Sequence, residues 1–506
     1  MDAERVSPAI VSLSVHPRCS SPRNKHPGSK KPNGVAQCRA PNVGKNEPPM
    51  SRPFAFRVAF DICGAVRLDR LQVNGFNRPA LNSSRPVRND ARRGDARPRP
   101  PSWSALARNQ CLHTRAVATL LLAPRERPNP VALPMTDRPA IIIVGHSARA
   151  LASSAKRAGF APLSIDVFGD DDTRELSLAD IKLEGGLSDG LTLDKVTDAV
   201  KTLTHTHSPI GLVYGSGFEH QPETIGAVAR MTRIFGNEAE TLKRVKDPHA
   251  LAQLCDRIGI SHPPILFAPP DEPEYWLVKR RGGAGGAHIS AATAGCMAPA
   301  DCYFQRRIAG QNISALFVAN GKTAGIIGLS VQWTAPTLTS PFRYGGSAGP
   351  IDVSAALAEE IACAVANFTS ELCLVGLNSA DFVVSADAVW LLEINPRPGA
   401  TLDVFEPDDG SLLALHVAGC EGRLMPLPTG LAFKAAEIVY APCDIVSSVE
   451  QNWPDWTVDR PSPGTRIAAG DPLCTTLASG ATVDLARACA RGRAQEIMAV
   501  AQESNQ

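Results

Sequence analysis

Several patterns that would place this 506-residue chain in a common functional class are missing from it. No apolar run approaches the ~18–20 residues of a membrane-spanning helix, and the apolar stretch 116–123 lies too far along the chain for a simple signal peptide. The thirteen cysteines are scattered singly, with no C-x-x-C pair and no His/Cys ligand spacing. We therefore expect reduced thiols in a cytoplasmic protein without a membrane partner.

Common nucleotide and nucleophile signatures are missing as well. The turn at 145–149 lacks G-x-G-x-x-G, so a dinucleotide-binding fingerprint is not supported, and the glycine-rich segment 282–286 is not a G-x-x-x-x-G-K-[ST] P-loop. No obvious Ser/His or Cys/His arrangement suggests a covalent nucleophile.

Charge and proline are concentrated in the first quarter of the chain. Residues 1–134 hold 23 Lys and Arg against 8 Asp and Glu, a net of +15, and 18 of the 42 prolines. A segment of this kind cannot bury enough apolar surface to offset chain entropy, so we expect a disordered arm.

Three interpretations of this arm remain open. An Arg-rich arm can bind nucleic acid or membranes, and a Ser-rich segment poor in acids also resembles a transit peptide. The interpretation we prefer is that the folded protein begins at Met135, and that 1–134 reflects an upstream start and is not part of the native protein. No nucleic-acid partner is expected for the folded part.

From Met135 onward the pattern predicts an α/β domain over residues 135–240. The continuous apolar run 140–144 and the run 161–167 read as parallel strands around a helix, and 210–214 as a further strand. The turn residues Gly145, Ser147 and Arg149 either meet a substrate at the carboxyl edge of the sheet or only shape the turn.

A lysine and a glycine-rich loop follow in the next block. Residues 276–279 read as a strand that ends in Lys279, and a loop with four glycines comes directly after it. Glycines let a backbone approach phosphate oxygens closely, and a strand lysine supplies a charge for the same phosphates. The alternative is a simple hairpin turn. The loop glycines are Gly282, Gly283, Gly285 and Gly286.

The most informative polar side chains lie on two expected strands near residue 390. Glu393 and Asn395 are two apart on an extended run, so they point to the same side, and Asp381 can join them from the neighbouring strand. Two carboxylates and an amide oxygen are hard ligands that suit Mg²⁺ carrying nucleotide phosphates. Arg397 adds a planar fork for phosphate or carboxylate.

Together these pieces resemble the ATP-grasp superfamily over residues 135–430, and in detail its predicted ATP-dependent carboligases related to biotin carboxylase. The resemblance implies an α/β and α+β fold. It comprises a Rossmann-like pre-ATP-grasp domain at 135–240, a two-subdomain ATP-grasp core at 241–430 and a small C-terminal β cap with a helix at 431–506.

The resemblance also assigns roles to residues. Lys279 corresponds to the phosphate-binding lysine, and the four loop glycines to the mobile loop over the phosphates. The adenine and ribose side is carried by Gln305, Ile308 and Asn312, although the family usually has acids at the first and last of these places. Lys246 is the nearest candidate for the first ATP lysine, with a solvated helix-start lysine as the alternative. Arg397 and Lys279 are the expected catalytic residues, and Asp381, Glu393 and Asn395 the expected metal ligands.

The implied enzyme is a C–N bond-forming ligase that uses ATP and Mg²⁺, or Mn²⁺ in its place, and produces ADP. It would join a small-molecule carboxylate to an amine through an acyl phosphate, with a homodimer as the expected assembly. Some members of the group are associated with methanofuran- or tetrahydromethanopterin-like cofactor synthesis. The alternatives are a carboligase that uses bicarbonate and a nucleotide-binding regulatory or scaffold protein without turnover.

Two further segments carry weaker expectations. The loop 333–349 reads as a substrate-facing lid in which Arg343 could grip an acidic acceptor, or as an ordinary long hairpin loop. After residue 430 the pattern predicts a small β unit followed by a helix over 482–499, with Lys434 as a minor candidate for substrate contact.

Overall fold

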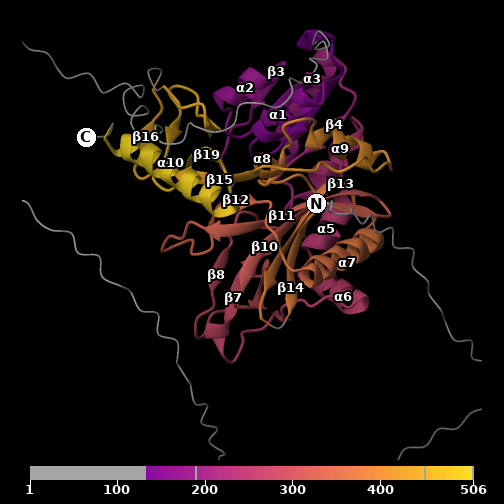
Figure 1. Ribbon diagram of the computed structural model, residues 1–506, viewed down its shortest axis with the longest axis vertical. Coiled ribbons are helices and arrows are strands. Elements are labelled where there is room, and N and C mark those ends of the chain that lie inside the picture. The colour runs from indigo at the N-terminus through magenta and orange to yellow at the C-terminus, as the bar shows by residue number, and fades with distance from the viewer. Residues whose placement is uncertain (1–132, 188–190, 387, 449–451, 504–506) are drawn as a thin grey trace, which may run out of the picture. The chain divides into compact units, whose positions relative to one another are not determined.

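The computed structural model describes residues 133–506 except 188–190, 387, 449–451 and 504–506 (Figure 1). The expectations for the basic arm, apart from its last two residues, lie outside the described residues. The described part of the chain falls within one compact unit. It contains no helix that is both long enough and apolar enough to cross a membrane.

A five-stranded parallel sheet in the order β3-β2-β1-β4-β5 opens the fold. In β1, Ile141 and Ile143 face one core while Ile142 and Val144 face another, so both faces of the strand are buried. This two-sided burial explains the continuous apolar run. The elements are β1 Ala140–Val144, α1 Arg149–Arg157, β2 Ala161–Asp166, α2 Asp171–Leu176, β3 Ala179–Lys182, α3 Leu193–His207, β4 Leu212–Tyr214, α4 Pro222–Val228 and β5 Ile234–Phe235.

Two helices, α5 Ala239–Lys246 and α6 Pro248–Ile258, lead out of this region. The Asp247 carboxylate accepts a hydrogen bond from the Ala250 amide at 2.8 Å and so caps α6, and Gly259, at φ 71°, ends it. A four-stranded sheet in the order β6-β9-β7-β8 follows. Its strands are β6 Ile265–Leu266, β7 Trp276–Arg280, β8 Ile289–Ala291 and β9 Cys302–Arg306.

An eight-stranded antiparallel sheet in the order β14-β13-β10-β11-β12-β15-β19-β17 forms the largest element of the fold. The strands after residue 430 extend this sheet, so the expected boundary at 430 falls within one sheet. The domain limits remain a proposal. The strands are β10 Gln311–Asn320, β11 Ala324–Thr334, β12 Tyr344–Gly349, β13 Val375–Val384, β14 Val389–Asn395, β15 Phe433–Tyr440, β17 Thr457–Val458 and β19 Pro472–Gly480, and β16 Ile445–Val446 pairs separately with β18 Arg466–Ile467.

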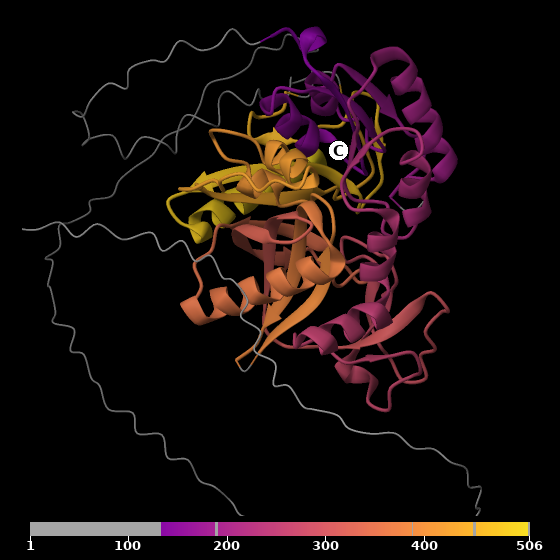
Figure 2. The same cartoon turned by 90° about the vertical axis from the view of Figure 1, so that its right-hand side faces the viewer.

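Helices cover both faces of the eight-stranded sheet. Helix α7 Ala355–Leu372 lies across one face (Figure 2), where Phe368 packs with Phe317 of β10. On the other face, α8 Leu402–Phe405 and α9 Leu412–Cys420 share a core with α1 and with Leu316 and Val318 of β10. Helix α10 Val483–Glu503 packs on β15 and β19 and confirms the helix predicted at the C-terminal end.

His416 joins α9 to both large sheets. Its Nδ1 accepts a hydrogen bond from the Leu377 amide at 2.8 Å, and its Nε2 lies 2.9 Å from the Phe235 carbonyl oxygen, so Nε2 carries the proton. Burial lowers the pKa of His416 to about 4, and the hydrogen bond to Phe235 opposes this shift.

We predict that His416 makes the protein less stable as the pH falls from about 6.5 to about 4. The unfolded state binds a proton in this range, whereas protonation of the folded state would replace the Nδ1 acceptor with a donor facing the Leu377 amide. The shift corresponds to a loss of the order of 3 kcal/mol in the free energy of unfolding. Urea unfolding at several pH values measures it. The His416→Gln variant should show a smaller pH slope, and an unchanged slope would contradict the prediction.

Candidate active site

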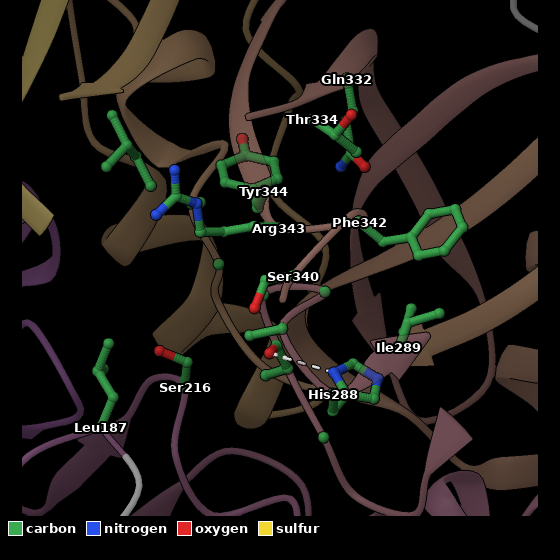
Figure 3. A pocket seen from close by; sticks show the side chains of 18 of the residues that line it. Leu187, Ser216, His288, Ile289, Gln332, Thr334, Ser340, Phe342, Arg343 and Tyr344 are labelled. Atoms are coloured by element: carbon green, nitrogen blue, oxygen red, sulfur yellow. Dashed lines mark hydrogen bonds between the residues drawn. The ribbon is translucent and has the colours of Figure 1, made fainter. Parts of the chain in front are cut away.

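A cleft of about 2040 Å³ opens between the three larger sheets. It is lined by segments that follow β1 and β4, by β7 with its glycine-rich loop, and by β13 and β14. Figure 3 shows part of its wall, with Ser216 after β4, His288 and Ile289 after the glycine-rich loop, and Arg343 and Tyr344 at the start of β12.

The three side chains expected to bind metal lie together in this cleft. Strands β13 and β14 pair with Asp381 opposite Glu393. The Nδ2 group of Asn395 donates to Asp381 Oδ2 at 3.0 Å and to Glu393 Oε1 at 3.2 Å. One amide therefore reaches both carboxylates, as the two-residue spacing on an extended strand predicts.

The electrostatics of this cluster favour a cation. Burial raises the pKa of Asp381 to about 6, and the Glu393 carboxylate adds to the shift. Burial acts in the same direction on Glu393, but the Lys246 and Lys279 ammonium groups hold its pKa well below its usual range. Two half-buried carboxylates and an amide are a donor set that fits Mg²⁺. Within the described residues there is no group of three or more His, Cys, Asp or Glu side chains that could hold a metal, and here the Asn395 amide oxygen, which accepts from Lys246, would complete the set.

Lys246 lies beside the same cluster. It is the last residue of α5, and its ammonium group donates to Asn395 Oδ1 at 2.7 Å and lies 3.7 Å from Glu393 Oε2. Its side chain is only 7% exposed, so the alternative of a solvated helix-start lysine is wrong. Lys246 lines a small pocket next to the main cleft together with Lys279 and Gly282.

Lys279, on β7, also lies near the cluster and lines the cleft. Strand β7 pairs with β9, and the Lys279 ammonium donates to Gln305 Oε1 at 3.2 Å. Burial lowers the pKa of Lys279, while the Glu393 and Asp381 carboxylates oppose the shift. Because Gln305 is neutral where the family usually has glutamate, it leaves the charge of Lys279 available to an anion in the cleft.

The glycine-rich loop packs against both walls of the cleft. A Cβ atom on Gly282 would lie 2.5 Å from the Glu219 carbonyl oxygen, and one on Gly286 would overlap the Phe342 carbonyl. The Tyr344 amide donates to the Gly285 carbonyl oxygen at 2.8 Å. The glycines at 282 and 286 are therefore needed for close approach of the backbone. The segment also connects the antiparallel strands β7 and β8, so the hairpin alternative describes its topology, and a role over the phosphates stays a prediction.

We predict that Gly286→Ala lowers ATP-dependent turnover about tenfold, because the new methyl group keeps the loop from closing against Phe342. Gly285→Ala is a matched control: both glycines have positive φ, 68° at Gly285 and 76° at Gly286, but a Cβ at 285 meets no atom within 4 Å. Steady-state assays of both variants measure the difference. Equal losses in the two variants would show that backbone strain, not closure, is responsible.

The remaining expected nucleotide contacts lie on the segment between β9 and β10. Ile308 and Asn312 both line the cleft, with Ile308 half-buried and Asn312 exposed at the start of β10. Together with Gln305 they form a continuous stretch of the cleft wall, as expected for an adenine and ribose site.

Arg397 follows β14 and is held by Glu219, which sequence reasoning missed. Arg397 Nε donates to Glu219 Oε1 at 2.8 Å, and its Nη2 lies 2.7 Å from the same oxygen. Burial alone would raise the pKa of Glu219, but the Arg397 guanidinium and the Lys246 ammonium lower it to about 2. The pair fixes Arg397 at the edge of the cleft, where its other N–H groups can face an anionic ligand.

The expectation that Arg343 grips an acidic substrate is wrong. Its Nε donates to the Ala335 carbonyl oxygen at 3.0 Å, its Nη1 donates to the Gly470 carbonyl oxygen at 2.8 Å, and its guanidinium stacks over the Tyr440 ring at 3.5 Å. The lid segment is also shorter than predicted, because β11 runs to Thr334 and β12 starts at Tyr344. Lys434 points away too, donating to the Glu406 carbonyl oxygen and to Asp408.

Two more polar residues near the cluster escaped the sequence analysis. Gln332 of β11 donates to Asp381 Oδ1 at 3.3 Å. His288 lines the cleft after the glycine-rich loop, and burial lowers its pKa to about 4, so it is neutral beside the lysines. Neither residue carries a local sequence signal, since each reaches the cluster only through the fold.

The chain was compared with protein families, curated sequences and solved structures. Residues 253–401 match the ATP-grasp domain family. A search of curated protein sequences gives no match. Many solved structures share the fold, and the likenesses are structural, at low sequence identity.

Three examples represent the solved structures. The biotin carboxylase domain of Hydrogenobacter thermophilus 2-oxoglutarate carboxylase, solved with MgADP, ADP and bicarbonate, is 10% identical with a TM-score of 0.55, covering 70% of this chain and 89% of that one. N5-carboxyaminoimidazole ribonucleotide synthetase from Thermotoga maritima is 12% identical with a TM-score of 0.51, covering 71% and 98%. Phosphoribosylamine–glycine ligase from the same organism is 15% identical with a TM-score of 0.52, covering 70% and 96%.

The resemblance to ATP-grasp proteins that the residues predict is therefore confirmed over residues 253–401. The mixed parallel and antiparallel sheets agree with the expected fold class. Residues 253–401 match the ATP-grasp domain family, and the fold of the described residues is similar to that of a biotin carboxylase domain.

Proposed function

We propose that the protein is an ATP-dependent carboxylate–amine ligase that forms an amide and releases ADP and phosphate. The observation that carries this proposal is the convergence of Asp381, Glu393 and Asn395 opposite Lys279, beneath a loop that only glycines allow to close. In this proposal ATP lies along Gln305, Ile308 and Asn312, with its phosphates toward the lysines.

The chemistry follows from the poor reactivity of a carboxylate toward an amine. Transfer of the γ-phosphoryl group makes an acyl phosphate, whose phosphate then leaves as the amine attacks the carbonyl carbon. Lys246, Lys279 and Arg397 neutralise and orient the phosphoryl oxygens, and the closed loop excludes water. Mg²⁺, or Mn²⁺ in its place, would be held by Asp381, Glu393 and Asn395, and would offset phosphate charge when bound.

A second candidate is a carboligase that uses bicarbonate as its carboxylate. It is favoured by the likeness to a biotin carboxylase domain solved with MgADP and bicarbonate and to N5-carboxyaminoimidazole ribonucleotide synthetase. A third, a nucleotide-binding regulatory or scaffold protein without turnover, rests on the replacement of the usual glutamate by Gln305.

A phosphate-release screen over pairs of carboxylic acids and amines separates these candidates. Release that requires ATP, one acid and one amine together supports the ligase. Release that requires bicarbonate instead identifies the carboligase, and ATP binding without release under any combination identifies the third candidate. Acids and amines from methanofuran- or tetrahydromethanopterin-like pathways belong in the panel, because the family resemblance suggests such a pathway. A homodimer and a cytoplasmic location complete the proposal.

A further inference from the structure

One end of the cleft is formed by loops at the carboxyl edge of the parallel sheet. Strand β1 lies between β2 and β4, and the chain crosses from β3 to β4 on the other side of β1, so the strand order reverses there in a topological switch point. The residues that line this end include Ser147 and Arg149 after β1, Asp170 after β2, and Asp459 from the loop after β17.

Arg149 is not available to an acidic substrate. Its Nη1 and Nη2 donate to the two Asp403 oxygens at 2.5 and 2.7 Å, and its Nε donates to Asp459 Oδ1 at 3.0 Å. Ser147 also donates to Asp459, at 3.1 Å. Of the two interpretations of these turn residues, a structural role is the one observed. Ser147 and Arg149 attach the start of α1 to the C-terminal part of the chain.

Most of the aspartates near this end have partners as well. Asp166 accepts hydrogen bonds from the amides of Ala148, at 3.1 Å, and Gly169, at 2.8 Å. Asp172 accepts from the amides of Asp459, at 2.8 Å, and Arg460, at 3.1 Å. Asp172 holds the loop after β17 against the start of α2, and Asp166 ties the turns after β1 and β2 together, so both roles are explained by the fold.

Asp170 is the exception. It is only 5% exposed and occupies the N-cap position of α2, yet its carboxylate makes no capping hydrogen bond. Within the part of the chain that the structure describes, its carboxylate has no hydrogen-bond or ion-pair partner, and it lines the cleft. An aspartate at an N-cap usually binds the helix amides, so this side chain is free for a ligand.

The charges around Asp170 indicate which kind of ligand this end of the cleft would bind. Burial raises the pKa of Asp170 to about 8, and the Asp459, Asp166 and Asp172 carboxylates add to the shift, while the Arg149 guanidinium opposes it. A buried carboxylate among other carboxylates is stabilised by a cation and destabilised by an anion. Asp166, Asp172 and Asp459 are engaged in the hydrogen bonds described above and do not gather with Asp170 around one point, so an organic cation fits this end better than a metal ion.

We propose that Asp170 binds a protonated amino group of the acceptor substrate that is separate from the unprotonated amine attacking the acyl phosphate, so that the acceptor of this ligase is a diamine or another amine with a second cationic group. The inference rests on the proposed ligase function and names the substrate class for one end of the cleft. The two ends then complement their ligands: lysines and Arg397 face the phosphates, while an acidic end faces the amine.

Isothermal titration calorimetry of the full chain with three matched probes tests this. Putrescine carries two ammonium groups, 1,4-butanediol has hydroxyls in their place, and succinate has carboxylates of similar spacing. We expect the wild type to bind putrescine in preference to the other two, and Asp170→Asn to weaken putrescine binding by at least about tenfold. Asp471→Asn is the matched control, because Asp471 is an exposed carboxylate on the wall of the same cleft.

Equal binding of putrescine and the diol, an unchanged affinity in Asp170→Asn, an equal loss in Asp471→Asn, or no putrescine binding to the wild type would each overturn the proposal. Binding of MgATP to Asp170→Asn, measured in the same way, shows that this variant is folded. The outcome is separable from the proposed function, because ATP-dependent phosphate release can survive the loss of this site and ammonium binding can occur without release.

Discussion

Replacing Glu393 with glutamine is expected to reduce ATP-dependent phosphate release by at least about a hundredfold. Glu393 lies between Lys246 and Asn395 and opposite Asp381, and it is the carboxylate that stays charged because two lysines lower its pKa. The glutamine has the same shape but no charge, so it removes the strongest metal ligand and leaves the lysines without their counter-charge. Initial rates at saturating ATP and Mg²⁺ measure the effect.

The matched control is Glu437→Gln. Glu437 is also a strand carboxylate of the eight-stranded sheet, but it pairs with Arg491 at 3.7 Å and does not line the cleft. This variant should keep activity within about twofold of the wild type. Full activity in Glu393→Gln, or an equal loss in the control, would refute the metal-ligand role of Glu393.

Replacing Lys279 is the second change with a large expected effect. We expect Lys279→Ala to lower turnover by at least about a hundredfold, because a buried ammonium group facing Asp381 and Glu393 is lost from the phosphate side of the cleft. Since alanine also leaves a cavity, Lys279→Met is the better probe: it keeps most of the buried chain and removes only the charge. Both variants should raise KM for ATP as well as lower kcat.

Lys434→Met serves as the control for Lys279. Lys434 is a strand lysine whose ammonium donates to the Glu406 carbonyl oxygen at 2.8 Å, away from the cleft. Thermal unfolding of all three variants shows whether they are folded. If Lys279→Met retains wild-type kcat and KM for ATP, Lys279 does not contact the phosphates.

The parts of the site that could be predicted are those that a local pattern encodes. Side chains two residues apart on a strand point to the same side, so the sequence predicts that Glu393 and Asn395 lie together. The pairing of β13 with β14 brings Asp381 next to them. The first strand was predictable for a similar reason: a continuous apolar run such as 140–144 is typical of a strand buried on both faces.

The residues that could not be predicted reach the site through long-range contacts. Glu219 and Arg397 are 178 positions apart in the chain, and the sequence around either residue does not indicate that they form an ion pair. The expectation for Arg343 failed because the partners that hold it, Gly470 and Tyr440, belong to strands and turns far along the chain. The sequence also could not show that the Asp170 carboxylate has no capping hydrogen bond, because an aspartate before a short helix is typical of an ordinary N-cap.

Calorimetric titration of the protein with ATP, with and without Mg²⁺, tests the central claim most directly. For the wild type we predict saturable binding at one site per chain that is at least about tenfold tighter with Mg²⁺, and for Glu393→Gln the loss of this dependence on Mg²⁺. Binding of ATP that is indifferent to Mg²⁺ in the wild type, or the absence of binding, would contradict the assignment of Asp381, Glu393 and Asn395 as the ligands of a nucleotide-bound metal.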